Sequence, residues 1–204
     1  MADGALTERP IQLHGSALAR RLLALAGWRV VFDGLPTKQG VLIIYPHTSN
    51  WDFVVGVLTK WAIGFPLSVW GKDTLFKLPL FGRWLRWIGV VPVDRHHAHG
   101  VVGAMIEQMT HAREQDRFLW LALSPEGTRS YRDSWRSGFY QVALQAQVPL
   151  ALAFFDYRER RVGVDSFIRL SGDADKDMAV IEARLGHRRG CKPQLASPIR
   201  LPRT

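Results

Sequence analysis

The sequence predicts an α/β domain in which a central, mixed but mostly parallel sheet is flanked by helices. Short apolar runs typical of buried strands alternate with segments of helical spacing, and this alternation favours a layered domain. The length of 204 residues is sufficient for one large core and too short for two large domains. We therefore expect a single domain over residues 1–204, with its functional site in loops that follow the strands.

The N-terminal segment, residues 1–27, is predicted to be amphipathic and helical. Leu18, Leu22 and Leu25 recur at helical spacing and share one face, while the two adjacent arginines at 20–21 face away from it. Such a helix either packs on the domain or rests on a bilayer, and the pattern is compatible with both arrangements.

The remaining elements are expected to alternate between strand and helix along the chain. Strands are expected where apolar runs are bounded by turn residues, and helices where apolar residues recur every three or four positions. The expected strands are 41–45, 67–70, 90–93, 117–123, 148–155 and 160–170. After the N-terminal segment, the first expected helix begins near residue 49 or 50, and the next three cover 100–116, 134–147 and 175–185. Ser134 is expected to cap the helix at 134–147. Residues 187–204, which contain three prolines, are expected to form a basic, irregular tail.

The charge of the chain favours anionic partners. Lys and Arg number 27 against 18 Asp and Glu, for a formal charge of +9. Nucleic acid, acidic lipid headgroups and phosphorylated substrates would all be attracted to such a surface. Cys191 is the only cysteine in the sequence and the N-terminus lacks a secretory pattern, so we expect a cytoplasmic protein. The longest apolar stretch, 53–70, is interrupted by Lys60 and Pro66, which favours peripheral contact with a membrane over a span.

A histidine and an aspartate follow the expected strand at 41–45. His47 comes after a proline and before small polar residues, and Asp52 lies about one turn into the next helix. Asp52 can fold back to accept a hydrogen bond from one ring nitrogen, which leaves the other nitrogen as a general base. Alternatively, Ser49 or Asn50 caps the helix and Asp52 only favours its N-terminus.

A second polar loop, SPEGTRS, follows the expected strand at 117–123. Gly127 would let the backbone approach a ligand, and Arg129 could hold a phosphate through paired hydrogen bonds. The sequence contains no serine elbow motif that would supply a nucleophile. A His and Asp pair without a protein nucleophile suits a base that activates the hydroxyl of a bound substrate.

The histidines at positions 96, 97 and 99 invite a metal hypothesis. They occur in the run DRHHAHG, without a cysteine pair or a regularly spaced second group of ligands. Histidine-rich turns of this kind are usually solvated. We therefore expect no metal site.

Taken together, these segments resemble the PlsC-like glycerolipid acyltransferases. The similarity covers residues 27–155 and includes the His-x4-Asp pattern at His47 and Asp52. It also includes a Pro-Val-x-Arg element that ends at Arg95 and the Glu-Gly-Thr-Arg block at 126–129. The order and spacing of the three blocks carry the resemblance, and they favour a catalytic role for His47 over simple helix capping.

The resemblance implies a glycerolipid-acyltransferase type of fold and roles for individual residues. His47 would be the general base on the acceptor hydroxyl, and Asp52 would orient it. The residues implied in substrate binding are Arg95, Glu126, Gly127, Thr128 and Arg129. The acyl donor would be a thioester of coenzyme A or of acyl carrier protein, attacked directly without an acyl-enzyme, and no further cofactor is expected. The leading acceptor is 1-acyl-glycerol-3-phosphate.

The resemblance also implies a peripheral enzyme at the inner face of the membrane. Burying an acyl chain contributes about 0.8 kcal/mol per methylene, so a long chain needs an apolar groove or access from a bilayer. The aromatic and aliphatic residues at 70–88 are then expected to lie at the interface. Ser124 stands where the family often has a larger apolar residue, and Arg136 where it often has lysine.

Other functions remain open from the sequence. Relatives acylate other lysolipids and amino-acid or sugar lipids, so the acceptor is not determined. The same His and Asp could serve a thioesterase or lipase in which water replaces the alcohol. A non-catalytic basic module that binds nucleic acid or anionic membrane would explain the charge but not the joint occurrence of the polar blocks; we therefore expect no nucleic-acid partner. The oligomeric state is not predicted.

Overall fold

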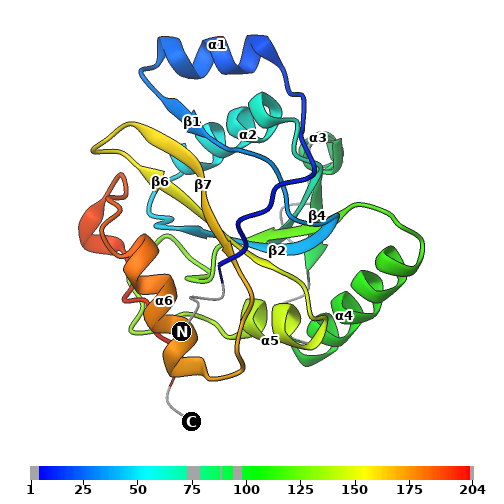
Figure 1. Cartoon of the computed structure of the whole chain (residues 1–204). Helices are drawn as coiled ribbons and strands as arrows, with labels where there is room; N and C mark the ends of the chain where they lie inside the picture. The colour runs from blue at the N-terminus through cyan, green and yellow to red at the C-terminus, as the bar shows by residue number, and fades with distance from the viewer. Residues whose placement is uncertain (1–4, 73–78, 88, 94–97, 203–204) are drawn as a thin grey trace.

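The core of the protein is a single sheet with helices on both faces (Figure 1). The computed structural model describes residues 5–72, 79–87, 89–93 and 98–202. Within these residues, seven strands are arranged in the order β1-β7-β6-β2-β5-β3-β4. Every neighbouring pair is parallel except β6 and β7, which are antiparallel. The predicted α/β fold with a mixed, mostly parallel sheet is therefore confirmed.

The bounds of the elements agree with most of the expected segments. The strands are β1 (Arg29–Val31), β2 (Gln39–Tyr45), β3 (Leu67–Lys72), β4 (Val90–Val93), β5 (Leu119–Leu123), β6 (Leu150–Asp156) and β7 (Arg161–Ile168). The helices are α1 (Ala17–Leu25), α2 (Trp51–Ile63), α3 (Pro79–Trp87), α4 (Ala98–Glu114), α5 (Gly138–Gln145) and α6 (Ala174–Leu185).

The central strand β2 supplies side chains to the cores on both faces of the sheet. Val41, Ile43 and Tyr45 belong to a buried cluster that also contains side chains of α4, α5 and α6. Leu42 and Ile44 point to the other face, which α1 and α2 cover. This alternation follows from the pleat of a strand, and burial on both faces explains why β2 is almost continuously apolar. Figure 1 shows the two helical layers above and below the sheet.

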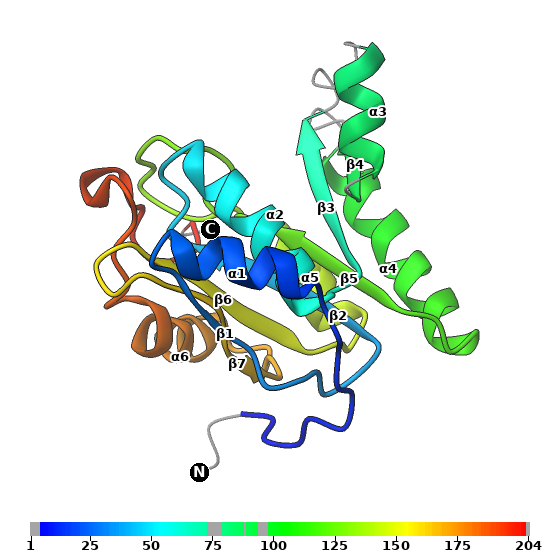
Figure 2. The same ribbon diagram turned by 90° about the horizontal axis from the view of Figure 1, so that it is seen from above.

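Helix α3 lies beside β3 and β4 at one end of the molecule (Figure 2). Its buried residue Leu85 packs against the apolar side of α2. Two edge-to-face aromatic pairs join the same helices, Phe53 with Trp84 and Trp61 with Trp87, each with ring centroids 5.8 Å apart. This helix was not expected from the sequence, in which only the surrounding strands were assigned.

The start of α5 also differs from the expectation. The helix begins at Gly138, so the prediction that Ser134 caps it is wrong. The residues before the helix instead place Trp135 in the core, where it is fully buried. The Trp135 amide donates to the Arg200 carbonyl at 2.8 Å, so this stretch is bound to the C-terminal segment and is not helical.

Candidate active site

The two polar loops predicted to carry chemistry lie at the same edge of the sheet. β2 and β5 are neighbouring parallel strands, so the loops that follow them leave the sheet side by side. A hydrogen bond joins the loops directly, because the His47 amide donates to Glu126 Oε2 at 2.7 Å. The structure thus brings the His47 loop and the Glu126 loop into one site.

His47 and Asp52 form a pair in the structure. His47 Nδ1 lies 3.1 Å from Asp52 Oδ2; the Asp52 side chain is fully buried, whereas that of His47 is 22% exposed. With Nδ1 directed at the carboxylate, Nε2 is the ring nitrogen left to accept a proton. This is the arrangement of a general base with an orienting carboxylate.

Asp52 is held by the backbone of its own loop and by a distant side chain. The amides of Thr48 and Ser49 each donate to Asp52 Oδ2 at 2.8 Å. The Tyr157 hydroxyl donates to Asp52 Oδ1 at 2.7 Å. Burial by itself would raise the pKa of Asp52, but the hydrogen bonds from His47, Tyr157 and the Ser49 amide outweigh it and lower that pKa below its usual value. Asp52 is therefore an ionised acceptor at neutral pH.

Helix capping and the His and Asp pair coexist at the start of α2. The Ser49 hydroxyl accepts a hydrogen bond from the Trp51 amide at 3.2 Å. Asn50 occupies the N-cap position without a side-chain cap hydrogen bond. Because Ser49 satisfies a helix amide, Asp52 remains available to His47, and the two interpretations of this stretch are compatible.

Glu126 is buried beneath the His47 loop. It is 2% exposed, and its second oxygen, Oε1, accepts from the Ser197 amide at 3.0 Å. Burial raises the pKa of Glu126, although the hydrogen bonds from the Ser197 and His47 amides oppose this effect. Both oxygens of this carboxylate therefore bind backbone amides, and the contact of Glu126 with the acceptor that the resemblance implies stays a prediction.

Gly127 adopts a backbone conformation that favours glycine. Its φ is +68°, in the left-handed region, and a Cβ there would lie 2.7 Å from Arg136 Nε. The Arg136 amide in turn donates to the Pro125 carbonyl at 2.8 Å. The loop thus folds back on itself around Gly127, and the exposed Arg136 side chain passes over the glycine.

Thr128 and Arg129, which are also implied in substrate binding, lie nearer the surface than Glu126. The Thr128 hydroxyl accepts from the Ser130 amide at 3.3 Å, and Arg129 is exposed. Arg95 lies outside the described residues, as do His96 and His97. Within the part of the chain that the structure describes, no cluster of three or more His, Cys, Asp or Glu side chains could hold a metal ion.

The C-terminal segment, residues 187–202, contributes contacts that the sequence did not indicate. The Lys192 amide donates to the Thr48 hydroxyl at 3.1 Å, and the fully buried Ser197 binds Glu126. The Tyr45 hydroxyl also donates to the Ser197 carbonyl at 3.1 Å. No local motif marks these residues, because most of their contacts are made by backbone groups. The segment holds both polar loops in place.

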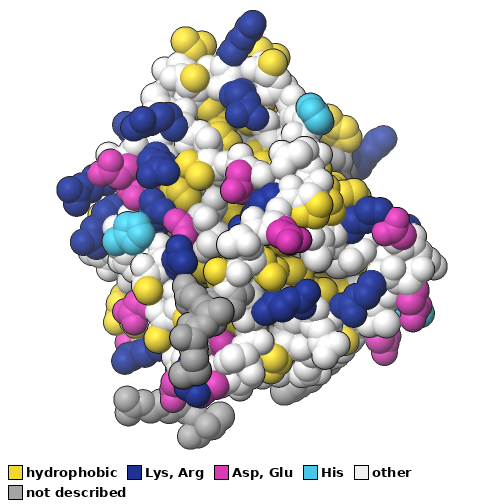
Figure 3. Space-filling view, in the orientation of Figure 1, with side chains coloured by type: hydrophobic (Ala, Val, Ile, Leu, Met, Phe, Trp, Pro, Cys, Tyr) yellow, Lys and Arg dark blue, Asp and Glu magenta, His cyan; other side chains and the backbone are white. Residues whose placement is uncertain are grey.

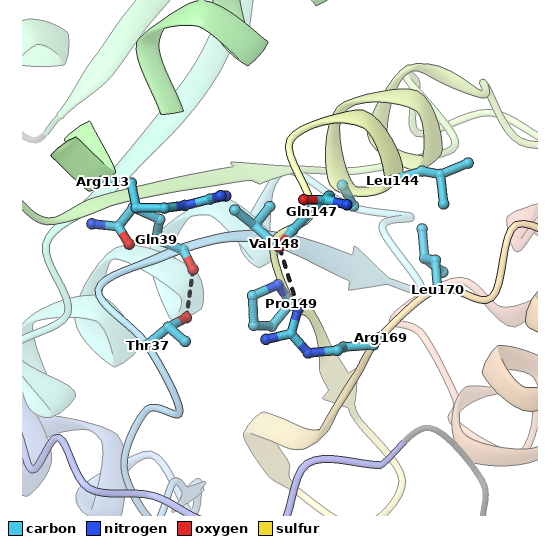
Figure 4. Close-up of a pocket in the computed structure, with 10 residues that line it drawn as sticks. Thr37, Gln39, Arg113, Leu144, Gln147, Val148, Pro149, Arg169 and Leu170 are labelled. Atoms are coloured by element: carbon cyan, nitrogen blue, oxygen red, sulfur yellow. Dashed lines mark hydrogen bonds between the residues drawn. The ribbon is translucent and has the colours of Figure 1, made fainter. Parts of the chain in front are cut away.

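A cavity of about 650 Å³ lies away from these loops, at the amino ends of β2 and β6 (Figure 4). Two arginines reach its rim. Arg113 donates to the Ala146 carbonyl, and Arg169 donates to the Gln147 carbonyl at 3.3 Å. Both guanidinium groups therefore bind carbonyls at the C-terminal end of α5, which is a favourable place for a positive charge.

Comparison with known proteins gives consistent matches. The model of the family described as Acyltransferase matches residues 29–151. A probable 1-acyl-sn-glycerol-3-phosphate acyltransferase 5 of Arabidopsis thaliana is 36% identical over 106 residues, which cover 49% of this chain and 28% of the relative. The 1-acyl-sn-glycerol-3-phosphate acyltransferase of Borreliella burgdorferi is 26% identical over 133 residues, which cover 64% of this chain and 49% of the relative. The chain thus spans half or less of the length of these relatives.

One solved structure has a similar fold. The crystal structure of the 1-acyl-sn-glycerophosphate acyltransferase PlsC from Thermotoga maritima superposes with a TM-score of 0.50 at 17% identity. The alignment covers 81% of this chain and 73% of the other. At this identity the likeness concerns the fold, and it extends beyond the segment that the family model matches.

Proposed function

The chain belongs to the acyltransferase family, and we propose that it transfers a fatty acyl group from a thioester donor to a hydroxyl of a lysolipid. The observation that carries this proposal is the pairing of His47 Nδ1 with the buried Asp52 at 3.1 Å. The leading acceptor is 1-acyl-glycerol-3-phosphate, because the two relatives reported above are named for that activity. Other lysolipids and amino-acid or sugar lipids are the alternative acceptors.

In the proposed reaction, His47 acts as the base. Its Nε2 takes the proton of the acceptor hydroxyl while the hydroxyl oxygen attacks the thioester carbonyl carbon. Collapse of the tetrahedral intermediate breaks the bond from carbon to sulfur, and His47 returns the proton to the departing thiolate. Asp52 keeps the ring oriented and stabilises the imidazolium that forms between these two steps.

Direct transfer without an acyl-enzyme agrees with the surroundings of His47. The hydroxyls of the same loop take part in structural hydrogen bonds, since Thr48 accepts from the Lys192 amide and Ser49 accepts from the Trp51 amide. Both residues are buried. The donor in this proposal is an acyl thioester of coenzyme A or acyl carrier protein, and the reaction needs no further cofactor.

The second loop would position the base and the acceptor. Glu126 supports the proposal by fixing the His47 amide. Arg129, which is exposed in the same loop, would bind the acceptor phosphate through charged hydrogen bonds. Replacing Arg129 with alanine is expected to raise the KM for the acceptor by roughly tenfold, with a smaller effect on kcat. The matched control is Arg117→Ala, an exposed arginine that precedes β5 at the opposite edge of the sheet. Equal acceptor KM values in the two variants would remove Arg129 from the site.

Helix α1 supports a peripheral association with membranes. Leu18, Leu22 and Leu25 are 67%, 45% and 85% exposed, while Ala19 and Leu23 are buried against the domain. Figure 3 shows hydrophobic and basic side chains next to each other over α1, at the top of the view. An amphipathic helix of this type binds anionic bilayers through its apolar face and its positive charge.

Exposed aromatic and aliphatic residues on the neighbouring helices would enlarge this surface. Trp51 at the start of α2 is 65% exposed, and Leu80 and Trp87 on α3 are 83% and 73% exposed. Both α1 and α3 pack on α2. None of the helices among the described residues has the length and apolar character needed to cross a bilayer. Because these apolar side chains are exposed on α1, α2 and α3, we propose that the reaction takes place at a membrane surface, with the acceptor drawn from the lipid layer.

The experiment that tests this function is a transfer assay with separate donors and acceptors. The purified protein is incubated with labelled acyl-CoA or acyl carrier protein thioester, with and without 1-acyl-glycerol-3-phosphate, and products are identified by mass spectrometry. Formation of the diacyl product supports the proposal. Release of free fatty acid alone would indicate a hydrolase, and no turnover with any lysolipid would indicate a non-catalytic module. Transfer only to another lysolipid would support the alternative acceptors.

A further inference from the structure

The two oxygens of the Asp52 carboxylate have different partners. Oδ2 faces His47 and the two loop amides. Among the residues that the structure describes, the donor to Oδ1 is the Tyr157 hydroxyl, at 2.7 Å. Because Asp52 is 1% exposed, bulk water is poorly placed to replace that hydroxyl. The orientation of the carboxylate plane therefore depends on Tyr157 as well as on its own loop.

Tyr157 is itself firmly placed. Its ring packs edge-on against Trp28, with centroids 4.9 Å apart and planes at 88°. Its amide donates to the Arg189 carbonyl at 2.8 Å, in the C-terminal segment that also binds Thr48. Both interactions limit how far the hydroxyl can move relative to Asp52.

From this geometry we propose that Tyr157 is a positioning residue for the pair of His47 and Asp52. Its hydroxyl holds Asp52 Oδ1 so that Oδ2 stays aligned with His47 Nδ1. This role rests on the proposed function only for the expected effect on kcat, and not for the contact between Tyr157 and Asp52. Tyr157 follows the end of β6 and lies beyond residue 151, where the match to the family ends. It thus comes from a part of the chain that none of the three motif blocks covers.

The ionisation of the two groups supports this assignment. Burial raises the pKa of Tyr157, and the hydrogen bond to Asp52 and its negative charge raise it further. Tyr157 therefore remains a protonated donor over the neutral range in which a histidine base would work. The same hydrogen bond acts on Asp52 as well, since it is one of those that lower the pKa of Asp52.

The test compares two Tyr→Phe variants that lose the same kind of hydrogen bond. In Tyr157→Phe, Asp52 loses its Oδ1 donor. In Tyr140→Phe, the buried Asp177 loses a hydroxyl donor of the same length, 2.7 Å, between α5 and α6 and outside the site. The measurements are kcat and KM for acyl transfer, the urea midpoint, and the ¹⁵N NMR signals of the His47 ring, which report which nitrogen carries the proton.

We expect Tyr157→Phe to lower kcat by roughly tenfold with little change in KM, because a hydrogen bond to a charged group is lost. It should also reduce the fraction of His47 protonated at Nδ1. Tyr140→Phe should lower the urea midpoint to a similar extent but leave kcat and the His47 signals as in the wild type. Wild-type kcat with wild-type His47 signals in Tyr157→Phe would overturn the proposal, as would equal kcat losses in both variants with no change at His47.

The NMR measurement separates this inference from the proposed function. If the wild-type protein transfers no acyl group to any lysolipid, the proposed function fails. The His47 signals of Tyr157→Phe then still decide whether the hydroxyl positions the pair. A change confined to Tyr157→Phe supports the positioning role, and unchanged signals overturn it.

Discussion

Asp52 connects three parts of the chain at one carboxylate. His47 and the loop amides approach Oδ2, and Tyr157 approaches Oδ1 from beyond β6. These donors favour the ionised form, which is why the pKa of Asp52 lies below its usual value in spite of burial. Such a group contributes stability that is complete above the pKa of an unfolded aspartate and is lost as the pH falls through the lower, folded value.

This linkage predicts a pH-dependent effect of Asp52→Asn. At pH 7 the variant should unfold with a free energy lower by about 1–3 kcal/mol, since charged hydrogen bonds are lost. The difference should shrink as the pH falls below about 4, because the wild type then loses the same contribution. Urea unfolding at several pH values measures this. Asp175→Asn, which alters an exposed residue at the start of α6, is the control for loss of charge. A difference that stays constant down to pH 3 would contradict the linkage.

For individual residues, local spacing predicted the pairing of His47 with Asp52 but not the distant residues that hold the site in place. The His-x4-Asp spacing across a strand-to-helix junction brings His47 and Asp52 together, as the structure confirms. Tyr157 and Ser197 act on the site from positions distant in sequence, and one uses a hydroxyl while the other uses a backbone amide. A tyrosine after a strand and a serine among prolines carry no spacing signal, so these contacts depend on the folded chain.

At the element scale, the loop after β5 depends on the backbone of Gly127. Because its φ is +68°, Gly127→Ala should lower the free energy of unfolding by about 1–2 kcal/mol. Gly103→Ala is the matched control, since Gly103 is exposed within α4 and a Cβ there meets nothing within 4 Å. The control should raise stability by about 0.5–1 kcal/mol. Thermal or urea unfolding of both variants measures the two effects, and a stabilised Gly127→Ala protein would contradict this account of the loop.

Strands and helices were predicted where their apolar residues follow a clear pattern, and they were missed where the pattern is short or weak. The strands β2, β5 and β6 are buried on both faces, and their apolar runs identified them. β1 has only three residues, too few to show a period. α3 contains glycine and several aromatic residues, which lowers its helical signal. The cap at Ser134 failed because Trp135 is required in the core, and burial of a large aromatic side chain outweighs a local capping preference.

At the scale of the whole molecule, the order of strands determines which loops meet. β2 lies between β5 and β6, so the loops that follow these three strands share one edge with the C-terminal segment. Alternating strands and helices predicted a mostly parallel sheet. The antiparallel pairing of β6 with β7 and the return of β1 beside β7 could not be read from the sequence. They depend on which apolar faces pack best once all the helices are in place.

The proposed association with membranes predicts an effect of the exposed leucines of α1. Replacing Leu18, Leu22 and Leu25 together with serine should weaken binding to anionic vesicles by at least about tenfold, because their apolar area drives insertion. Replacing the same residues with methionine keeps the surface apolar and should preserve binding. Vesicle sedimentation measures both variants. Equal binding of the serine and methionine variants would show that another surface makes the contact.

His47 is the proposed base for acyl transfer to a lysolipid. The most direct measurement is the rate of diacyl product formed from 1-acyl-glycerol-3-phosphate by His47→Ala, with His111→Ala, an exposed histidine on α4, as the control. Both proteins should be folded, as circular dichroism can verify. We predict a loss of about 10² to 10⁴ in kcat for His47→Ala and none for His111→Ala. Wild-type turnover by folded His47→Ala would show that His47 is not the base.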